Sequence, residues 1–265
     1  MGSALTYLAI RPVRAFGRTG IGVARHAGGL GLLVWRIGRA LISGRVTLRS
    51  VTAQMYEMGV LSLPLVMVTA VLSGIVTSQQ GGYQFTGSVP LYVLGSVVAS
   101  SVVLELGPVM TAFVVIGRVG ARITAEIGTM QVSEQIDALL SVGRDPVSVL
   151  AAPRLIAGIV VMPLLVGVSN TVGLFAGLVA ARLTVGLGGE SFLYGARLFW
   201  HNWDLFYSLM KATVFGFVIP LISTHMGFLT RGGAEGVGRA TTSSVVFMII
   251  SVLVLDALFP PLFLN

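Results

Sequence analysis

The sequence contains no cysteine and a single lysine, and charged residues make up only 10% of its 265 residues. Roughly 25% is usual for a soluble domain. Without cysteine, disulfides and thiolate chemistry are excluded. The Walker A motif needs a lysine after its glycine-rich loop, but Lys211 follows Met210 inside an apolar run. The chain therefore cannot bind ATP phosphates through that motif.

Motifs for enzyme chemistry are also missing. His26, His201 and His225 are too scattered for a zinc motif such as H-E-x-x-H, and no G-x-S-x-G elbow occurs. We therefore predict no catalytic residue, no metal site, and a chain that is not itself an enzyme.

Hydrophobic residues account for 55% of the chain and gather in runs of about 20 residues or more. Each run is long enough to cross roughly 30 Å of hydrocarbon as a helix, and none alternates like a barrel strand. We predict an all-α integral membrane protein with five transmembrane helices. The predicted spans are Gly59–Ser78, Val89–Gly117, Leu155–Ala181, Leu205–Leu229 and Ser244–Leu264. Lys211 and His225 fall near opposite ends of the fourth span, where long polar side chains can reach the interface.

The basic residues are distributed unevenly about these spans. Eight arginines precede the first span, four lie between the second and third, and two lie between the fourth and fifth. Only Arg182, Arg197 and Lys211 fall on the other side. By the positive-inside rule we predict a cytoplasmic N-terminus and a C-terminus on the outer face. The same distribution explains the net charge of +7 and disfavours a nucleic-acid partner.

Residues 1–50 are predicted to form a basic interfacial segment, and residues 51–265 a five-helix membrane domain. Four arginines recur at helical spacing beside apolar side chains, a pattern typical of a helix in the headgroup region, and they are Arg11, Arg14, Arg18 and Arg25. The apolar stretch 28–41, interrupted by Arg36 and Arg39, predicts a second interfacial element. A disordered basic tail is the alternative.

A short amphipathic helix is predicted at about residues 131–143, between the second and third spans. Its apolar residues share one helical face, and they are Val132, Ile136, Leu139 and Leu140. Ser133 can cap its start, and Gly143 can end it. Such a helix either docks on a cytoplasmic partner or merely joins two spans.

Glu105 is an acidic residue inside an otherwise apolar or weakly polar run. It lies about 12 residues, or roughly 18 Å, from the cytoplasmic end of its span. An ionisable group at that depth costs at least about 2.5 to 3.5 kcal/mol, so we expect it to face the bundle interior, a partner or a water-filled cavity. Either it lines a substrate cavity, or it is protonated and hydrogen-bonded to a neighbouring helix. Gly107 and Pro108 would open the helix at this level and favour the cavity.

Proline and glycine indicate a bundle of bent, closely packed helices. Every span holds a proline, and we predict helix kinks at Pro64, Pro108, Pro163 and Pro220. The motif GLFAG, Gly173 to Gly177, predicts close approach to a neighbouring helix.

The stretch ELGPVMTAFVVIGRVGARITAEIGTMQVSEQIDALLSVGRDPVSVLAAPR, which begins at Glu105, resembles the signature region of the MlaE/YrbE permeases. These are the membrane subunits of MCE-associated ABC transporters. The likeness extends through GIVVMPLL and GRATTSSVV and covers most of the chain from about Arg49 onward. It implies an assembly in the bacterial inner membrane that moves phospholipids between the inner and outer membranes. The expected partners are a second copy of the chain, a cytoplasmic ATPase dimer that binds ATP and Mg, and a periplasmic ring of MCE-domain proteins. No cofactor is expected in this chain.

The resemblance also implies roles for individual residues. Glu105 matches the glutamate of the family's ELGP block near a central lipid cavity, where Leu106 follows and Tyr83 and Phe85 are expected at the rim. The amphipathic helix matches the coupling helix that docks on the ATPase. The expected ATPase-coupling residues are Glu126, Glu134, Gln135, Ile136, Asp137, Ala138, Leu139 and Gly143. Two alternatives stay open: a proton-driven secondary transporter that uses Glu105, and a membrane scaffold that anchors a periplasmic partner.

Overall fold

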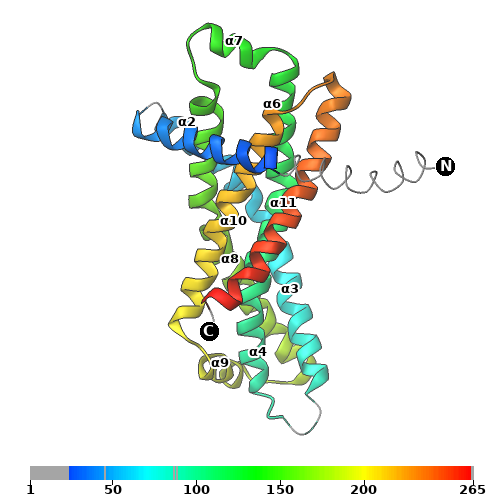
Figure 1. Cartoon of the computed structure of the whole chain (residues 1–265). Coiled ribbons are helices and arrows are strands. Elements are labelled where there is room, and N and C mark those ends of the chain that lie inside the picture. Colours follow the sequence, from blue (N-terminus) through cyan, green and yellow to red (C-terminus); the bar gives the residue numbers. More distant parts are fainter. Residues whose placement is uncertain (1–23, 45, 86, 88, 264–265) are drawn as a thin grey trace, which may run out of the picture.

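The computed structural model describes residues 24–44, 46–85, 87 and 89–263, and every regular element within these ranges is helical. Long helices run side by side along one axis, with α7 at one end of the bundle and α9 at the other (Figure 1). The all-α fold is therefore confirmed. The arginines predicted to form an N-terminal headgroup helix lie outside the described residues, except for Arg25.

Five helical segments are long and apolar enough to cross a membrane, as the sequence predicts. They are Leu48–Gln84, Val93–Val132, Val147–Val185, Asn202–Phe228 and Gly233–Phe263. The second segment continues well past its predicted end at Gly117. Its extra turns carry Arg118, Arg122 and Glu126. The side chains of these residues pair with groups on other helices, so the helix continues past them.

The first three spans are interrupted by short segments of tighter or wider helix. In the first span α2 (Leu48–Met58) and α3 (Leu63–Gln84) are joined by a 3₁₀ turn, η1 (Val60–Ser62). The second span runs through α4 (Val93–Ser100), π-helix η2 (Ser101–Leu106), α5 (Gly107–Val115), π-helix η3 (Ile116–Gly120) and α6 (Ala121–Val132). In the third, π-helix η4 (Val147–Ala151) leads into α8 (Ala152–Val185). Such π-helical turns are rare and occur frequently at functional sites.

The remaining helices connect or complete these spans. α7 (Gln135–Ser141) joins α6 to η4, and α9 (Gly189–Leu198) joins α8 to α10 (Asn202–Phe228). α11 (Gly233–Phe263) follows α10 after a turn in which Gly232 and Gly233 both have positive φ. Only glycine adopts this conformation without strain, so the two long helices can reverse direction within a few residues.

The predicted kink prolines occupy two kinds of position. Pro64 and Pro108 lie in the first turns of α3 and α5. The first N–H groups of a helix have no partner within that helix, so a proline here costs it no hydrogen bond. Pro163 and Pro220 lie inside α8 and α10. The first pair therefore marks joints between helical segments, whereas bending at the second pair stays a prediction.

Glycines bring the backbones of three helices together at the centre. A Cβ at Gly74 of α3 would overlap the backbone carbonyl of Gly173 in α8 and lie 3.1 Å from the amide nitrogen of Gly177. Gly158 of α8 and Gly216 of α10 face each other in the same way. The GLFAG motif is thus a helix contact, as predicted, and it fixes α3 against the central helix α8.

A helix over residues 24–42 lies crosswise to the long helices (Figure 1, dark blue). Its buried residues Leu33 and Ile37 pack against η4 and α8, and Leu221 of α10 belongs to the same cluster. Two polar contacts add to this packing: Arg36 pairs with Asp145 at 3.0 Å, and His26 lies 3.3 Å from His225. The sequence predicts this segment as an interfacial element, and the placement at a membrane surface stays a prediction.

Candidate functional site

Glu105 belongs to a cluster of three charged side chains from three helices. Lys211 of α10 is fully buried, and its Nζ lies 2.6 Å from Oε2 of Glu105 in η2 and 2.5 Å from Oδ1 of Asp256 in α11. The ring of Tyr207, one turn earlier on α10, lies 5.5 Å from the same Nζ. The structure therefore corrects one expectation, because Lys211 faces the bundle interior and does not extend to the membrane interface.

The proline after Glu105 helps to hold the lysine. Pro108 has no N–H, so the carbonyl four residues earlier, on Leu104, has no α-helical donor from that position. Lys211 Nζ donates to this carbonyl at 3.2 Å. An ammonium group has three donors, and here it meets two carboxylates and one carbonyl. Two of the three donors thus hydrogen-bond within the protein, to Leu104 and Glu105, while Asp256 contributes its charge at 2.5 Å.

The cluster is not balanced in charge. Glu105 and Asp256, when ionised, carry two negative charges against the single positive charge of Lys211. Within the described residues neither carboxylate pairs with another basic side chain. In surroundings of low dielectric an uncompensated charge is costly, so a second cation near either carboxylate is favoured.

An open groove lies on the other side of Glu105. It has a volume of about 620 Å³ and runs between α3 and the α4–η2–α5 part of the second span. Its lining residues are Leu72, Ser73, Val76, Thr77, Gln80, Gly81, Gln84, Val97, Ser101, Glu105, Leu106 and Met110. The structure thus brings the predicted cavity residues Glu105 and Leu106 to one groove between the first two apolar segments.

Tyr83 and Phe85, the expected rim residues, do not line this groove. Tyr83 is 85% exposed near the end of α3, and Phe85 packs against the cluster around Leu94 and Phe192. Gln80 and Gln84, on the polar face of the same helix, line the groove in their place. The spacing of Ser73, Thr77, Gln80 and Gln84 at i, i+4, i+7 and i+11 was the available signal in the sequence.

The predicted coupling helix is shorter than expected. In the structure α7 covers Gln135–Ser141, whereas the prediction spans about 131–143. Ser133 does not cap it: Glu134 occupies the N-cap with a positive φ of 60°, and the Ser133 hydroxyl donates to the carbonyl of Thr129. A left-handed residue breaks the helix, so residues 131 and 132 belong to α6 and share no continuous face with α7.

Most of the predicted coupling residues are exposed at the end of the bundle. Glu134, Gln135, Asp137 and Ala138 are exposed, and Leu139 is half-buried. Ile136 is buried and holds α7 against the bundle core. Gly143 has a φ of 73° directly after the helix, which suits a helix stop. The exposed side of α7 therefore carries Asp137 beside Leu140, with Glu134 at the N-cap, while Ile136 packs into the bundle core.

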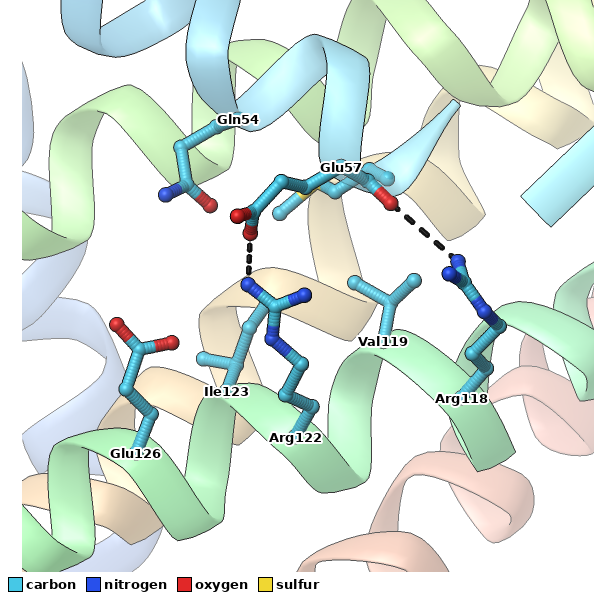
Figure 2. A pocket seen from close by; sticks show the side chains of 8 residues that line it. Gln54, Glu57, Arg118, Val119, Arg122, Ile123 and Glu126 are labelled. Carbon is cyan, nitrogen blue, oxygen red and sulfur yellow. Dashed lines mark hydrogen bonds and ion pairs between the residues drawn. The ribbon is translucent and has the colours of Figure 1, made fainter. Parts of the chain in front are cut away.

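A polar clamp, formed by Glu57, Arg118, Arg122 and Ser62, ties the second span to α2 and η1. Figure 2 shows Arg122 reaching from α6 to the carboxylate of Glu57 on α2. Arg118 donates to the carbonyl of Glu57 at 3.3 Å and to the Ser62 hydroxyl at 2.7 Å. Because these contacts cross between helices, a displacement of α6 would be passed to the start of the first span.

Glu126, expected among the coupling residues, forms an ion pair with Arg154 at 2.6 Å. The Arg154 side chain is only 3% exposed, while that of Glu126 is 42% exposed. Nη1 of Arg154 has no hydrogen-bond partner within the described part of the chain. Glu126 is therefore the main compensation for a buried guanidinium.

Replacing Glu126 by glutamine is expected to lower the free energy of unfolding by about 2 kcal/mol, since a buried charge loses its charged acceptor. Unfolding in detergent measures this, with Glu190→Gln on the exposed start of α9 as the matched control. If Glu126→Gln instead leaves stability unchanged and alters ATPase activity in a complex, its role lies in coupling.

The five apolar segments and the buried charges between them define a multi-pass α-helical membrane protein. The model of the family described as Permease MlaE matches residues 51–261. A probable ABC transporter permease of Synechocystis sp. is 37% identical over 214 residues, which cover 81% of each chain. One of Rickettsia prowazekii is 38% identical over 84% of this chain and 86% of its own length.

A plant protein is similar as well. The chloroplastic protein TRIGALACTOSYLDIACYLGLYCEROL 1 of Arabidopsis thaliana is 34% identical over 82% of this chain and 62% of its own length. The chain belongs to the MlaE permease family. It is a membrane permease subunit, as the resemblance of its ELGP and EQIDAL stretches indicates.

Proposed function

We propose that this chain is the permease half of an ABC transporter that moves phospholipids between the inner and outer membranes of a bacterium. Separate cytoplasmic subunits would bind ATP and Mg and hydrolyse the nucleotide. The observation that supports this most directly is the continuity of the second span. One helical segment, Val93–Val132, lines the groove with residues of its first half, Glu105 among them, and is followed directly by α7 at its other end.

This continuity suggests how a partner could act on the groove. Force applied to α7 would reach α6 and then η2, because no loop interrupts the second span. The polar clamp would carry part of the motion to α2 and α3, which forms the opposite wall of the groove. The π-helical segments η2 and η3 are the positions along this path where the helix can change its winding at least cost.

The remaining assembly follows from the family resemblance. The side that carries α7 is the cytoplasmic side in this proposal, so the N-terminus is cytoplasmic and the C-terminus periplasmic. A second copy would complete the lipid cavity, and a ring of MCE-domain proteins would receive the lipid in the periplasm. The exposed apolar residues of α3, among them Leu65, Val68 and Leu72, suit contact with lipid or with that second copy.

Reversing the charge of Asp137 tests the docking of the ATPase. We expect Asp137→Lys to weaken docking by about tenfold or more, because a lysine replaces an acidic side chain on the exposed face of α7. The amount of ATPase that co-purifies, and its activity in the complex, measure the effect. Glu190→Lys, on α9 at the other end of the bundle, is the matched control.

If both variants retain the ATPase equally, α7 does not couple the two proteins. Transport in proteoliposomes separates the proposal from its rivals. Transport that continues without ATP and stops when the proton gradient is collapsed would support a proton-driven transporter. A purified complex that contains no phospholipid and transports none would support a scaffold.

A further inference from the structure

The groove beside Glu105 has two chemically different walls. On α3, the polar side chains of Ser73, Thr77, Gln80 and Gln84 follow one face over three turns. The apolar lining consists of Leu72, Val76, Val97, Leu106 and Met110. No lining residue is basic. An amphiphile would therefore find hydroxyls and amides for its head, hydrocarbon for its chains, and no positive charge.

Among the described residues, Glu105 is the only charged side chain that lines the groove. The Glu105 side chain is 43% exposed, and Oε1 has no hydrogen-bond partner among the described residues, because Lys211 bonds to Oε2. Lys211 itself is fully buried behind Glu105, and Asp256 lies outside the lining. The excess negative charge of the cluster is thus available to the groove through one free carboxylate oxygen.

The polar and apolar walls of the groove and the free carboxylate oxygen of Glu105 together indicate which lipid headgroup would fit. We propose that the groove prefers lipids whose headgroup carries a hydrogen-bond-donating ammonium, which lies against Oε1 of Glu105 and balances the extra charge of the cluster. Lipids with an anionic headgroup and no amine are disfavoured. A water-soluble amine would leave the apolar wall unused, so the occupant is a lipid. This inference rests on the proposed function and adds the chemical class of the substrate.

The complete transporter complex in nanodiscs tests this. The discs contain equal amounts of phosphatidylethanolamine, phosphatidylcholine and phosphatidylglycerol, and mass spectrometry measures the lipids retained after detergent extraction. The Val76→Trp variant fills the groove from an exposed position. Any lipid that wild-type protein retains and this variant does not is assigned to the groove. We expect phosphatidylethanolamine to be enriched over phosphatidylglycerol by about tenfold, as one charge-assisted hydrogen bond would give. Phosphatidylcholine, whose quaternary ammonium is cationic but has no N–H donor, should fall between them.

Two variants separate the charge from the fold. Glu105→Gln keeps the shape of the side chain, leaves Lys211 balanced by Asp256, and should abolish the enrichment. Asp256→Asn acts from outside the groove and should reduce it, since Glu105 alone then balances the lysine. Glu190→Gln makes the same change as the first variant at an exposed site on α9 and should retain the wild-type enrichment.

The possible results have different meanings. If wild-type protein retains groove lipid with no headgroup preference, or if Glu105→Gln keeps the full preference, the ammonium assignment is wrong while lipid transport stands. Full enrichment in Asp256→Asn would overturn the charge-balance argument. If no lipid depends on Val76, the groove binds no lipid, and the proposed function loses its substrate site.

Discussion

Replacing Lys211 by methionine is expected to lower the free energy of unfolding by about 3–5 kcal/mol, the usual result of removing one partner from a buried ion pair. Methionine has nearly the length of lysine, so packing against Tyr207 is largely kept. What is lost is the ammonium that two carboxylates and the Leu104 carbonyl share. Without it, the two carboxylates have no cation between them, and their repulsion drives the helices apart.

A further variant tests whether the loss of stability in Lys211→Met comes from the unpaired carboxylates or from the change of side chain itself. A triple variant with Lys211→Met, Glu105→Gln and Asp256→Asn contains no charge in the cluster, and we expect it to recover most of the stability. Arg197→Met, on the exposed side of α9, is the matched control and should change stability by less than about 0.5 kcal/mol. Unfolding in detergent micelles measures all three. A Lys211→Met variant as stable as the control would show that the ion pairs contribute nothing to folding.

The number and type of the spans could be predicted from the sequence, because continuous apolar runs have few alternatives in a bilayer. Their ends could not. Arg118, Arg122 and Glu126 look like the start of a cytoplasmic loop, but each has a partner on another helix, and this keeps the second span helical through Val132. Partners supplied by tertiary structure leave no local signal in the chain.

The same reasoning applies to the site. Glu105 is visible in the sequence because it is an isolated acid in an apolar run, and the structure places it beside the groove. Asp256, which has the same isolated character in the last span, was missed, and Lys211 was assigned to the interface. The sequence shows that all three are charged residues inside apolar runs. Their pairing depends on how η2, α10 and α11 pack together, and the sequence alone does not predict that packing.

Adding one methyl group at Gly74 is expected to destabilise the bundle by about 3 kcal/mol or more, although alanine usually favours a helix over glycine by about 0.5–1 kcal/mol. The reason is the contact between α3 and α8. A Cβ at position 74 would overlap the backbone carbonyl of Gly173, which cannot move aside as a flexible side chain could. The two helices would have to separate along the whole contact.

Gly167→Ala is the matched control, because it makes the same change inside α8 at a position where a Cβ meets no atom within 4 Å. We expect that variant to have an unchanged or slightly higher free energy of unfolding, whereas Gly74→Ala lowers it. α3 also carries the polar wall of the groove, so its displacement should reduce the lipid retained there in proportion to the loss of stability. Unfolding measurements and lipid retention on the same preparations test both parts. Equal stability of the two variants would mean that the close approach of α3 to α8 does not hold the groove together.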